Sequence, residues 1–174
     1  MSTNSSILIA YDGSPDARHA VAQAAALMPG AKAVVVYVRH PLEGMAAHFE
    51  GHPTLERVDA IDASERDTAE QLADEGAEYA RELGLDAEPR VANATEAIAD
   101  TIVAVADELD ATLVVAGARG RRGLKSLLLG SVSHHIVHHT RRPTLIVPST
   151  ALATARREAV RVLASDGKRS VALL

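Results

Sequence analysis

The sequence of 174 residues carries a formal net charge of −5, and hydrophobic residues make up 47% of it while aromatic residues make up only 2%. These values predict one globular domain, and they argue against a protein that grips nucleic acid with a basic face or stacks bases on exposed aromatic rings. The sequence contains no cysteine, which excludes disulfides and thiol chemistry, and its apolar runs fall short of the roughly 20 residues that cross a bilayer.

The first elements are a buried strand and a helix with a recognisable start. Ile7–Tyr11 is a short apolar run, which predicts a buried strand. In the Asp-Gly-Ser-Pro turn that follows, Ser14 is a candidate N-cap and Pro15 a candidate first helical residue. The pattern then predicts a helix over Asp16–Met28 and a second buried strand, rich in β-branched residues, over Ala33–Val38.

The middle of the chain predicts a loop, a long helix and a short strand. His40–Pro53 is rich in histidine, glycine and proline, and we expect a surface loop there. Thr54–Leu83 predicts a long charged helix, with Gly84 as the residue that ends it. Ala87–Val91 predicts a short third strand.

The last third of the pattern begins with a helix that Thr95 is expected to cap. Its apolar residues recur at helical spacing, at Ile98, Ile102, Val105 and Leu109. A fourth strand is predicted over Thr112–Ala116, a helix over Val132–His139 and a fifth strand over Thr144–Val147.

Strands and helices therefore alternate from residue 1 to residue 148, which predicts an α/β fold with an open, doubly wound, parallel sheet and helices on both faces. We expect residues 149–174 to form a C-terminal extension that is helical over Ala151–Ala164. The N-terminus has no secretory-signal pattern. We therefore expect a cytoplasmic protein with neither a membrane nor a nucleic-acid partner.

Glycines at two points of the chain predict the chemistry. Gly117 and Gly120 follow the fourth strand, while Gly130 and Ser131 come just before the last helix. Ligands of open α/β sheets bind beyond the carboxyl ends of the strands, and a helix N-terminus with unpaired N–H groups favours an anion. Glycines there would let a phosphate approach the backbone and would tolerate positive φ, while Ser131 would cap the helix or donate to a phosphate. The alternative is that the glycines only form tight turns.

Two better-known phosphate motifs do not fit. A dinucleotide fingerprint needs G-x-G-x-x-G after the first strand, where this chain has Asp-Gly-Ser-Pro. A P-loop needs glycine directly before lysine, whereas Leu124 stands between Gly123 and Lys125. Basic residues do gather in this stretch of an otherwise acidic chain, at Arg119, Arg121, Arg122 and Lys125.

The spacing G-x2-G-x9-G-[ST], formed by Gly117, Gly120, Gly130 and Ser131, resembles the nucleotide-binding signature of the universal stress protein family. The resemblance extends from Ser5 to Pro148. It implies a five-stranded parallel sheet in the order 3-2-1-4-5. It also implies bound ATP, or AMP or cyclic AMP, with Mg²⁺ carried by the nucleotide.

The resemblance also implies roles for individual positions. Asp12 would contact the ribose or the adenine, and Ala10 and Val38 would line the adenine. The ribose and phosphates would be held by residues of the two glycine segments, namely Gly117, Arg119, Gly120, Gly130, Ser131, Val132 and Ser133. Family members often pair through the last strand, so Thr144–Val147 is the expected edge of a homodimer.

Some alternatives stay open at this point. Asp12 could also be a general base or a turn-forming residue, although no catalytic set can be assembled from the spacing. Four histidines of one short helix could bind a metal, respond to pH or form a solvated face: His134, His135, His138 and His139. We expect a nucleotide-dependent stress-response regulator with no catalytic residues, and the alternatives are an interaction module independent of nucleotide or a slow ATPase.

Overall fold

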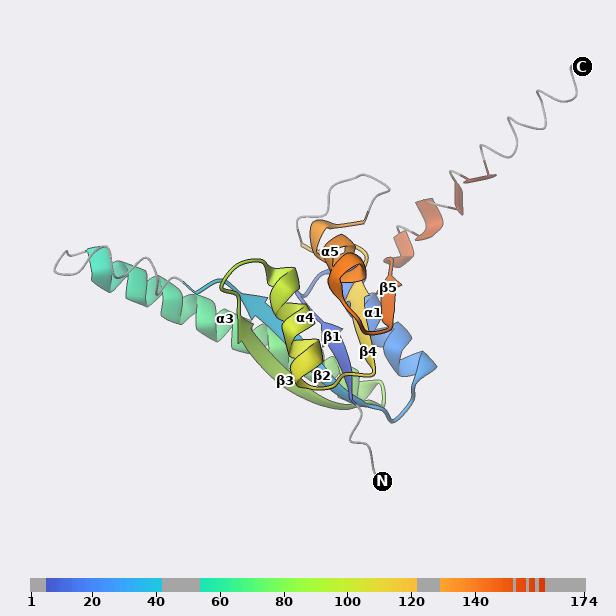
Figure 1. The fold of residues 1–174 in the computed structure, drawn as a ribbon, viewed down its shortest axis with the longest axis horizontal. Coiled ribbons are helices and arrows are strands. Elements are labelled where there is room, and N and C mark those ends of the chain that lie inside the picture. The colour runs from blue at the N-terminus through green and yellow to red at the C-terminus, as the bar shows by residue number, and fades with distance from the viewer. Residues whose placement is uncertain are drawn as a thin grey trace, which may run out of the picture.

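A computed structural model describes residues 6–41, 54–121, 129–151, 153–155, 157–158 and 160–161, with only the backbone described at 54–59. Its centre is a five-stranded, entirely parallel sheet in the order β3-β2-β1-β4-β5 (Figure 1). The strands are β1 (Ile7–Ala10), β2 (Lys32–Arg39), β3 (Asp86–Asn93), β4 (Leu113–Gly117) and β5 (Thr144–Val147). The predicted α/β fold and its strand order are confirmed.

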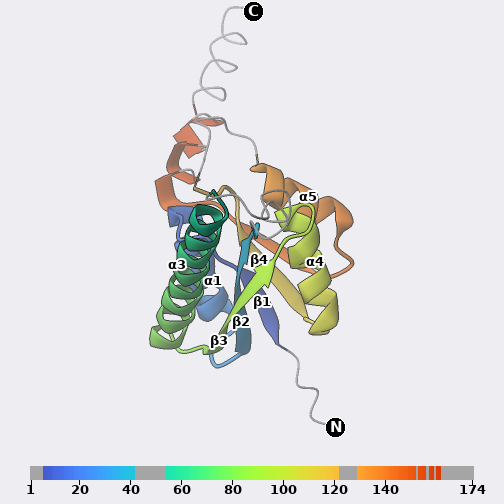
Figure 2. The ribbon, with the colours of Figure 1, turned by 90° about the vertical axis from the view of Figure 1, so that its left-hand side faces the viewer.

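Helices cover both faces of the sheet. They are α1 (Pro15–Leu27), α3 (Thr54–Glu82), α4 (Ile98–Glu108) and α5 (Ser131–His139). Figure 2 shows α1 and α3 on one face and α4 and α5 on the other. Beyond β5, the described residues from 150 to 161 are helical, in agreement with the predicted helix there. The predicted loop at His40–Pro53 lies outside the described residues from position 42 onward.

The two predicted helix starts have different outcomes. Ser14 caps α1 as expected, because its Oγ accepts a hydrogen bond from the N–H of Ala17 at 3.2 Å, and Pro15 begins the helix. The prediction that Thr95 caps α4 is wrong. The N-cap of α4 is Ala97, and no side chain caps that helix.

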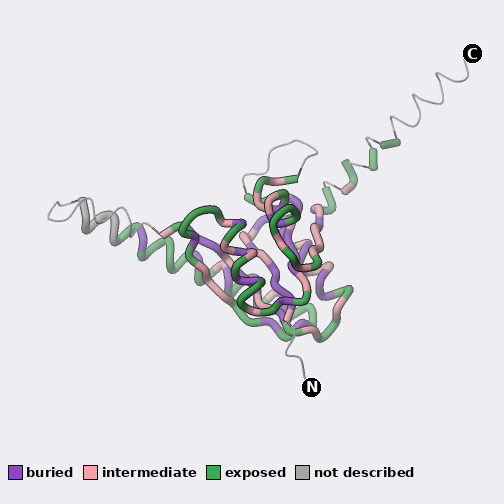
Figure 3. The backbone as a smooth tube through the Cα atoms, viewed as in Figure 1, coloured by how far each residue is buried: buried purple, intermediate pink, exposed green. Residues whose placement is uncertain are grey.

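Alternate residues of each strand belong to separate apolar layers, as expected for a sheet that is buried on both faces. Ile7 and Ile9 of β1 pack with α1 and α3, whereas Leu8 packs with α4 and α5. Buried positions follow the strands and the sheet-facing sides of the helices (Figure 3). Among the described residues, no helix is long and apolar enough to cross a membrane.

The layer between the sheet and helices α1 and α3 is built from small side chains. The buried residues of these two helices include eight alanines, namely Ala17, Ala20, Ala24, Ala25, Ala69, Ala73, Ala77 and Ala80. At Gly76 of α3, an added Cβ would lie 2.7 Å from the ring of Tyr11, closer than real carbon atoms approach. The backbones of both helices can therefore lie close to the strands.

A buried ion pair fastens α3 to the carboxyl ends of β2 and β3. The Arg39 guanidinium lies 2.9 Å from the Asp62 carboxylate, and both side chains are almost completely buried. Arg39 also donates to the side-chain oxygen of Asn93 at the end of β3. Removing one partner of such a pair leaves an uncompensated buried charge, so the contact fixes the position of α3 beside the end of the sheet.

Candidate functional site

The predicted site residues converge where the direction of the strand order changes. The chain passes from β1 to β2 on one side of β1, while β4 lies on its other side, with Ala10 opposite Ala116. The turn after β1 and the loop after β4 therefore leave the sheet side by side. This topological switch point is where open α/β sheets bind their ligands.

Asp12 holds the first part of the loop after β4. One carboxylate oxygen accepts a hydrogen bond from the N–H of Arg121 and the other from the N–H of Ser14, each at 3.0 Å. A Cβ at Gly120 would lie only 2.6 Å from the same carboxylate. Glycine at position 120 is therefore what lets the loop approach Asp12.

Asp16 holds the same loop from a second direction, and sequence analysis missed it. Its Oδ2 accepts a hydrogen bond from the N–H of Arg119 at 3.1 Å and lies 4.0 Å from the Arg119 guanidinium. The Asp16 side chain is nearly buried, and a Cβ at Gly117 would lie 2.7 Å from the Asp16 carbonyl carbon. An acidic residue in the first turn of α1 was a signal, but by itself it indicates only a favourable interaction with the helix dipole.

The glycines do not play the conformational part that was expected of them. Among the described glycines, positive φ values occur at Gly13, Gly30 and Gly84, and not at the three glycines of the motif. The positive φ that glycine would tolerate is therefore not used at the three motif positions. Gly117 and Gly120 are needed because protein atoms approach them closely.

The start of α5 is tied to the loop after β4. Gly130 is the N-cap of this helix, and its N–H donates to the carbonyl of Ala118 at 2.8 Å. The buried Ser133 hydroxyl donates to the same carbonyl at 2.8 Å. Since that hydroxyl is used within the protein, any contact of Ser133 with a phosphate falls to its backbone N–H.

Ser131 is the first residue of α5 and is exposed, and no side chain caps the helix. The expectation that Ser131 might serve as the cap is wrong. No acidic residue lies in the first turn of α5 either. The partial positive charge of this helix end is therefore not offset within the first turn.

Three apolar site residues share the face of the sheet that carries α4 and α5. Val38 is buried in that layer, and Ala10 and Val132 pack against it partly buried. All three therefore belong to the apolar layer between the sheet and helices α4 and α5. Of the basic residues of this stretch, Arg122 and Lys125 lie outside the described residues.

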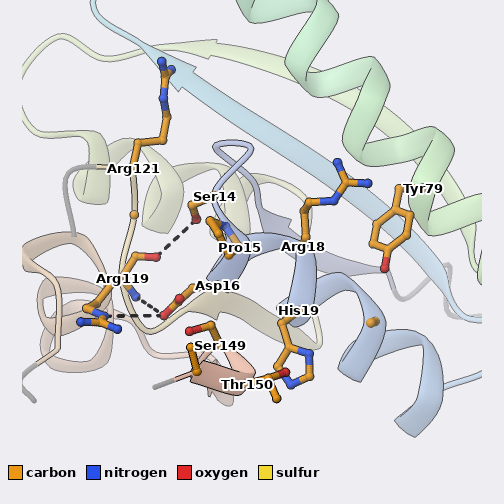
Figure 4. A pocket seen from close by; sticks show the side chains of 13 residues that line it. Ser14, Pro15, Asp16, Arg18, His19, Tyr79, Arg119, Arg121, Ser149 and Thr150 are labelled. Carbon is orange, nitrogen blue, oxygen red and sulfur yellow. Dashed lines mark hydrogen bonds and ion pairs between the residues drawn. The ribbon is translucent and has the colours of Figure 1, made fainter. Parts of the chain in front are cut away.

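A cavity of about 720 Å³ opens on the other face of the sheet, beside α1 (Figure 4). Of the predicted site residues it includes only Arg119 and Gly120. Its remaining walls come from Arg121 of the same loop, from the first two turns of α1 and the residue before it, from Tyr79 of α3 and from residues 149–151 after β5. This cavity is therefore distinct from the apolar layer near α5.

Tyr11 links the end of β1 to α3. Its hydroxyl donates to the Glu75 carboxylate at 2.8 Å, and Glu75 also binds Arg18 at 2.5 Å. Burial, and then the hydrogen bond to Glu75 and its negative charge, raise the pKa of Tyr11 above its ordinary value. The residue before Asp12 is therefore held as a neutral phenol.

The histidines of α5 form two ring pairs. The rings of His134 and His138 lie 4.5 Å apart and those of His135 and His139 lie 4.0 Å apart. His135 also meets Asp100 of α4 at 2.6 Å, a carboxylate 35 residues away that sequence analysis did not connect with the helix. Within the described ranges, no three metal-ligating side chains converge to hold an ion.

Residues 3–148 match the sequence model of the Universal stress protein family. The chain belongs to this family. A universal stress protein of Thermus aquaticus is 33% identical over 145 residues, which cover 81% of this chain and 96% of that protein.

Solved structures of the family have the same fold. A universal stress protein in complex with cAMP is 25% identical, with a TM-score of 0.56 over 84% of this chain and 98% of that one. A universal stress protein of Archaeoglobus fulgidus in complex with dAMP is 23% identical, with a TM-score of 0.55 over 82% of this chain and 97% of that one.

Proposed function

We propose that this universal stress protein binds an adenine nucleotide, ATP in the first place, at the carboxyl ends of β1 and β4. One observation carries the proposal. All four positions of the G-x2-G-x9-G-S motif lie around a single loop at the switch point of the sheet, and Gly130 contacts Ala118 directly. The related protein that is 25% identical and bound to cAMP supports adenine as the base.

The phosphates would lie at the start of α5. The backbone N–H groups of Ser131, Val132 and Ser133 are the first of that helix, and no side chain caps them. Unpaired N–H groups and the helix dipole favour an anion there, and no acidic residue in the first turn opposes it. The exposed Ser131 hydroxyl adds a donor, and Mg²⁺ would arrive with the nucleotide.

The ribose and the base would lie toward β1 and β2. The carboxylate oxygens of Asp12 each accept one N–H, and each has a second lone pair for a ribose hydroxyl. Ala10 and Val38 would form the apolar wall for the adenine, and the backbone of Val38 would meet its edge. Gly117, Arg119 and Gly120 would lie against the ribose and the first phosphate.

The role that we propose is regulatory. No nucleophile, base and orienting group come together at the described part of the site, which favours binding over turnover. Nucleotide would bias a homodimer formed through β5, or the contact with a partner protein. The cytoplasm and a stress response are the setting that family membership suggests.

A second candidate is an interaction module that needs no nucleotide. One observation favours it. The N–H groups of Arg119, Arg121 and Gly130 already bond to protein oxygens, so this part of the loop is satisfied without a ligand.

Titration calorimetry with Mg-ATP, on protein freed of co-purified nucleotide, separates the two candidates. We expect binding by the wild type and loss of binding in Gly130→Val, because the added Cβ would start 3.3 Å from the Ala118 carbonyl and enter the phosphate approach. Ala26→Val, at the exposed far end of α1, is the matched control and should bind like the wild type.

Circular dichroism must show that Gly130→Val is folded, and Gly130→Ala replaces it if it is not. A folded variant with wild-type affinity would show that the nucleotide binds elsewhere. If the wild type neither binds Mg-ATP nor carries nucleotide from the cell, the interaction module is the better description.

A further inference from the structure

The cavity beside α1 is not explained by the proposed nucleotide site. It lies on the face of α1 and α3, whereas the apolar layer of Ala10, Val38 and Val132 lies on the face of α4 and α5. Its volume of about 720 Å³ is within the range of small-molecule sites. We propose that this cavity is a second binding site, for a small molecule that carries a phosphoryl group.

The charge of the lining points to an anion. Three arginines border the cavity, namely Arg18, Arg119 and Arg121, although the chain as a whole carries a net charge of −5. Among the described residues of the lining, Asp16 is the only one with a carboxylate, and its Oδ2 already accepts the Arg119 N–H. A phosphoryl group would therefore meet two cationic side chains, Arg18 and Arg119, each of which also has one carboxylate partner in the protein, Glu75 and Asp16. Figure 4 shows the Arg121 side chain pointing away from Asp16 and His19.

Arg18 is the best placed of these cations. Its guanidinium lies 4.8 Å from the centre of the Tyr79 ring and binds Glu75 through Nη1, and its side chain remains 48% exposed. A guanidinium has five N–H donors, so these contacts leave others for a ligand. Figure 4 shows Arg18 and His19 on the wall that α1 forms, with Tyr79 beside Arg18.

The remaining lining suits the organic part of such a molecule. Pro15, Ala22 and the Tyr79 ring provide apolar surface, while Thr150 provides a hydroxyl from the segment after β5. Pockets that bind small molecules combine apolar walls with a few polar groups that fix orientation. Inorganic phosphate alone would use only the polar part, so a sugar phosphate should bind more tightly.

The site also touches the glycine loop. Arg119 contributes to the cavity, and its guanidinium lies 4.0 Å from Asp16, which is at the limit of an ion pair. A phosphoryl group in the cavity would draw the guanidinium away from Asp16. The position of the loop would then depend on both ligands, and their affinities would be coupled reciprocally.

The test is a titration of the ¹⁵N-labelled full chain with glucose 6-phosphate, inorganic phosphate and glucose, followed by amide chemical shifts. We expect saturable shifts at Arg18, His19 and Thr150 with glucose 6-phosphate, weaker binding of phosphate and none of glucose. Arg18→Gln should weaken the binding at least tenfold. The matched control Arg90→Gln removes an arginine paired with Glu108 outside the cavity and should leave it unchanged.

The Gly130→Val variant separates this site from the proposed nucleotide cleft. Shifts that persist in that variant support the cavity, whatever becomes of ATP binding. Shifts confined to Gly130–Ser133 would overturn the proposal, as would the absence of saturable shifts or unchanged binding in Arg18→Gln. If Arg18→Gln is not folded, His19→Gln takes its place with the same expectation.

Discussion

Two carboxylates and two glycines account for the shape of the loop after β4. Asp12 and Asp16 accept the N–H groups of Arg121 and Arg119, and Gly120 and Gly117 are the positions that lie closest to them. Two anionic side chains of the protein thus hold the first part of this loop, at Arg119 and Arg121. Glycine at position 117 is therefore a requirement of the protein's own packing against the α1 backbone, besides anything that a nucleotide demands.

The substitution Asp16→Ala should destabilise the protein by about 1–3 kcal/mol, because it leaves the Arg119 N–H in a half-buried site without its acceptor. Urea denaturation measures the change. The control Asp74→Ala removes an exposed carboxylate of α3 and should change the free energy of unfolding by less than about 0.5 kcal/mol. Equal effects of the two substitutions would contradict the anchoring role.

Tyr11 should make the stability fall at alkaline pH. Its pKa in the folded protein is raised above the unfolded value of 10.0, chiefly by burial, so folding favours the neutral phenol. The stability that this provides is complete below pH 10 and is lost as the pH rises further.

The variant Tyr11→Phe tests this prediction. Because this variant lacks the hydrogen bond to Glu75, its free energy of unfolding at pH 7 should be lower than that of the wild type by about 1 kcal/mol. Its free energy of unfolding should then fall less steeply than that of the wild type above pH 10. Parallel pH profiles of the two proteins, obtained by urea denaturation, would show that Tyr11 is not the group responsible.

At the scale of the elements, β5 is the edge strand that matters for assembly. The carbonyls of Pro143 and Val147 accept from β4, so by the two-residue period the backbone of Leu145 also faces β4. The N–H and C=O of Ile146 then face outward, where the described part of the chain provides no further strand. An unpaired edge of this kind can pair with a second copy.

We therefore expect Ile146→Pro to lower the mass of a β5-paired dimer to that of the monomer, because proline removes an outward N–H that the second copy would need. Light scattering after size exclusion measures the mass. The control is Val91→Pro on β3. The N–H groups of Asp86 and Ala94 bond toward β2, so by the two-residue period the N–H of Val91 faces outward, and its loss should not change the mass. A dimer that survives Ile146→Pro must form through another surface.

Patterns within single elements were enough to predict the α/β class, and the strand order came from the family resemblance. Contacts between distant residues were not predicted. The strands and helices were predicted from apolar runs and from the Ser14 cap, which depend on neighbours in sequence. Thr95 fails as a cap because the chain bends at Thr95 and Glu96 and α4 begins only at Ile98, three residues later.

The sequence predicted a position for the candidate site, at the carboxyl ends of β1 and β4. It did not predict the contacts within that site. Asp16 and Arg119 are 103 residues apart, and no periodicity connects them. The Arg39–Asp62 ion pair was also missed. Asp62 belongs to a charged helical pattern, and such a pattern normally predicts a solvated face.

At the scale of the whole molecule, the sheet separates two candidate sites that share one loop. The proposed nucleotide cleft lies toward α5 and the cavity lies beside α1, and Figure 2 shows these two helices on opposite faces of the sheet. A ligand that binds the folded chain and not the unfolded chain raises its stability by mass action. The melting temperature of the folded chain therefore reports whether a ligand binds to it.

We expect Mg-ATP at about 100 times its dissociation constant to raise the melting temperature by about 5–10 °C, which corresponds to about 2.7 kcal/mol for a chain of this size. Thermal denaturation followed by circular dichroism measures the shift. Gly130→Val should show no shift, and Ala26→Val should show that of the wild type. A shift retained in Gly130→Val would mean that the stabilising nucleotide binds outside the cleft.

The alanines that α1 and α3 bury against the sheet limit which substitutions these helices can tolerate. Every single-base change of an alanine codon that alters the residue gives glycine, serine or something larger, such as valine, threonine or glutamate. Extra methyl groups in a tightly packed interior typically cost about 1–3 kcal/mol. At positions such as Ala24, Ala73 and Ala77, which have almost no exposed surface, damage should therefore come mostly from added volume rather than from cavities. Inherited variation on these two helix faces should be limited to the few exchanges that keep the residue small.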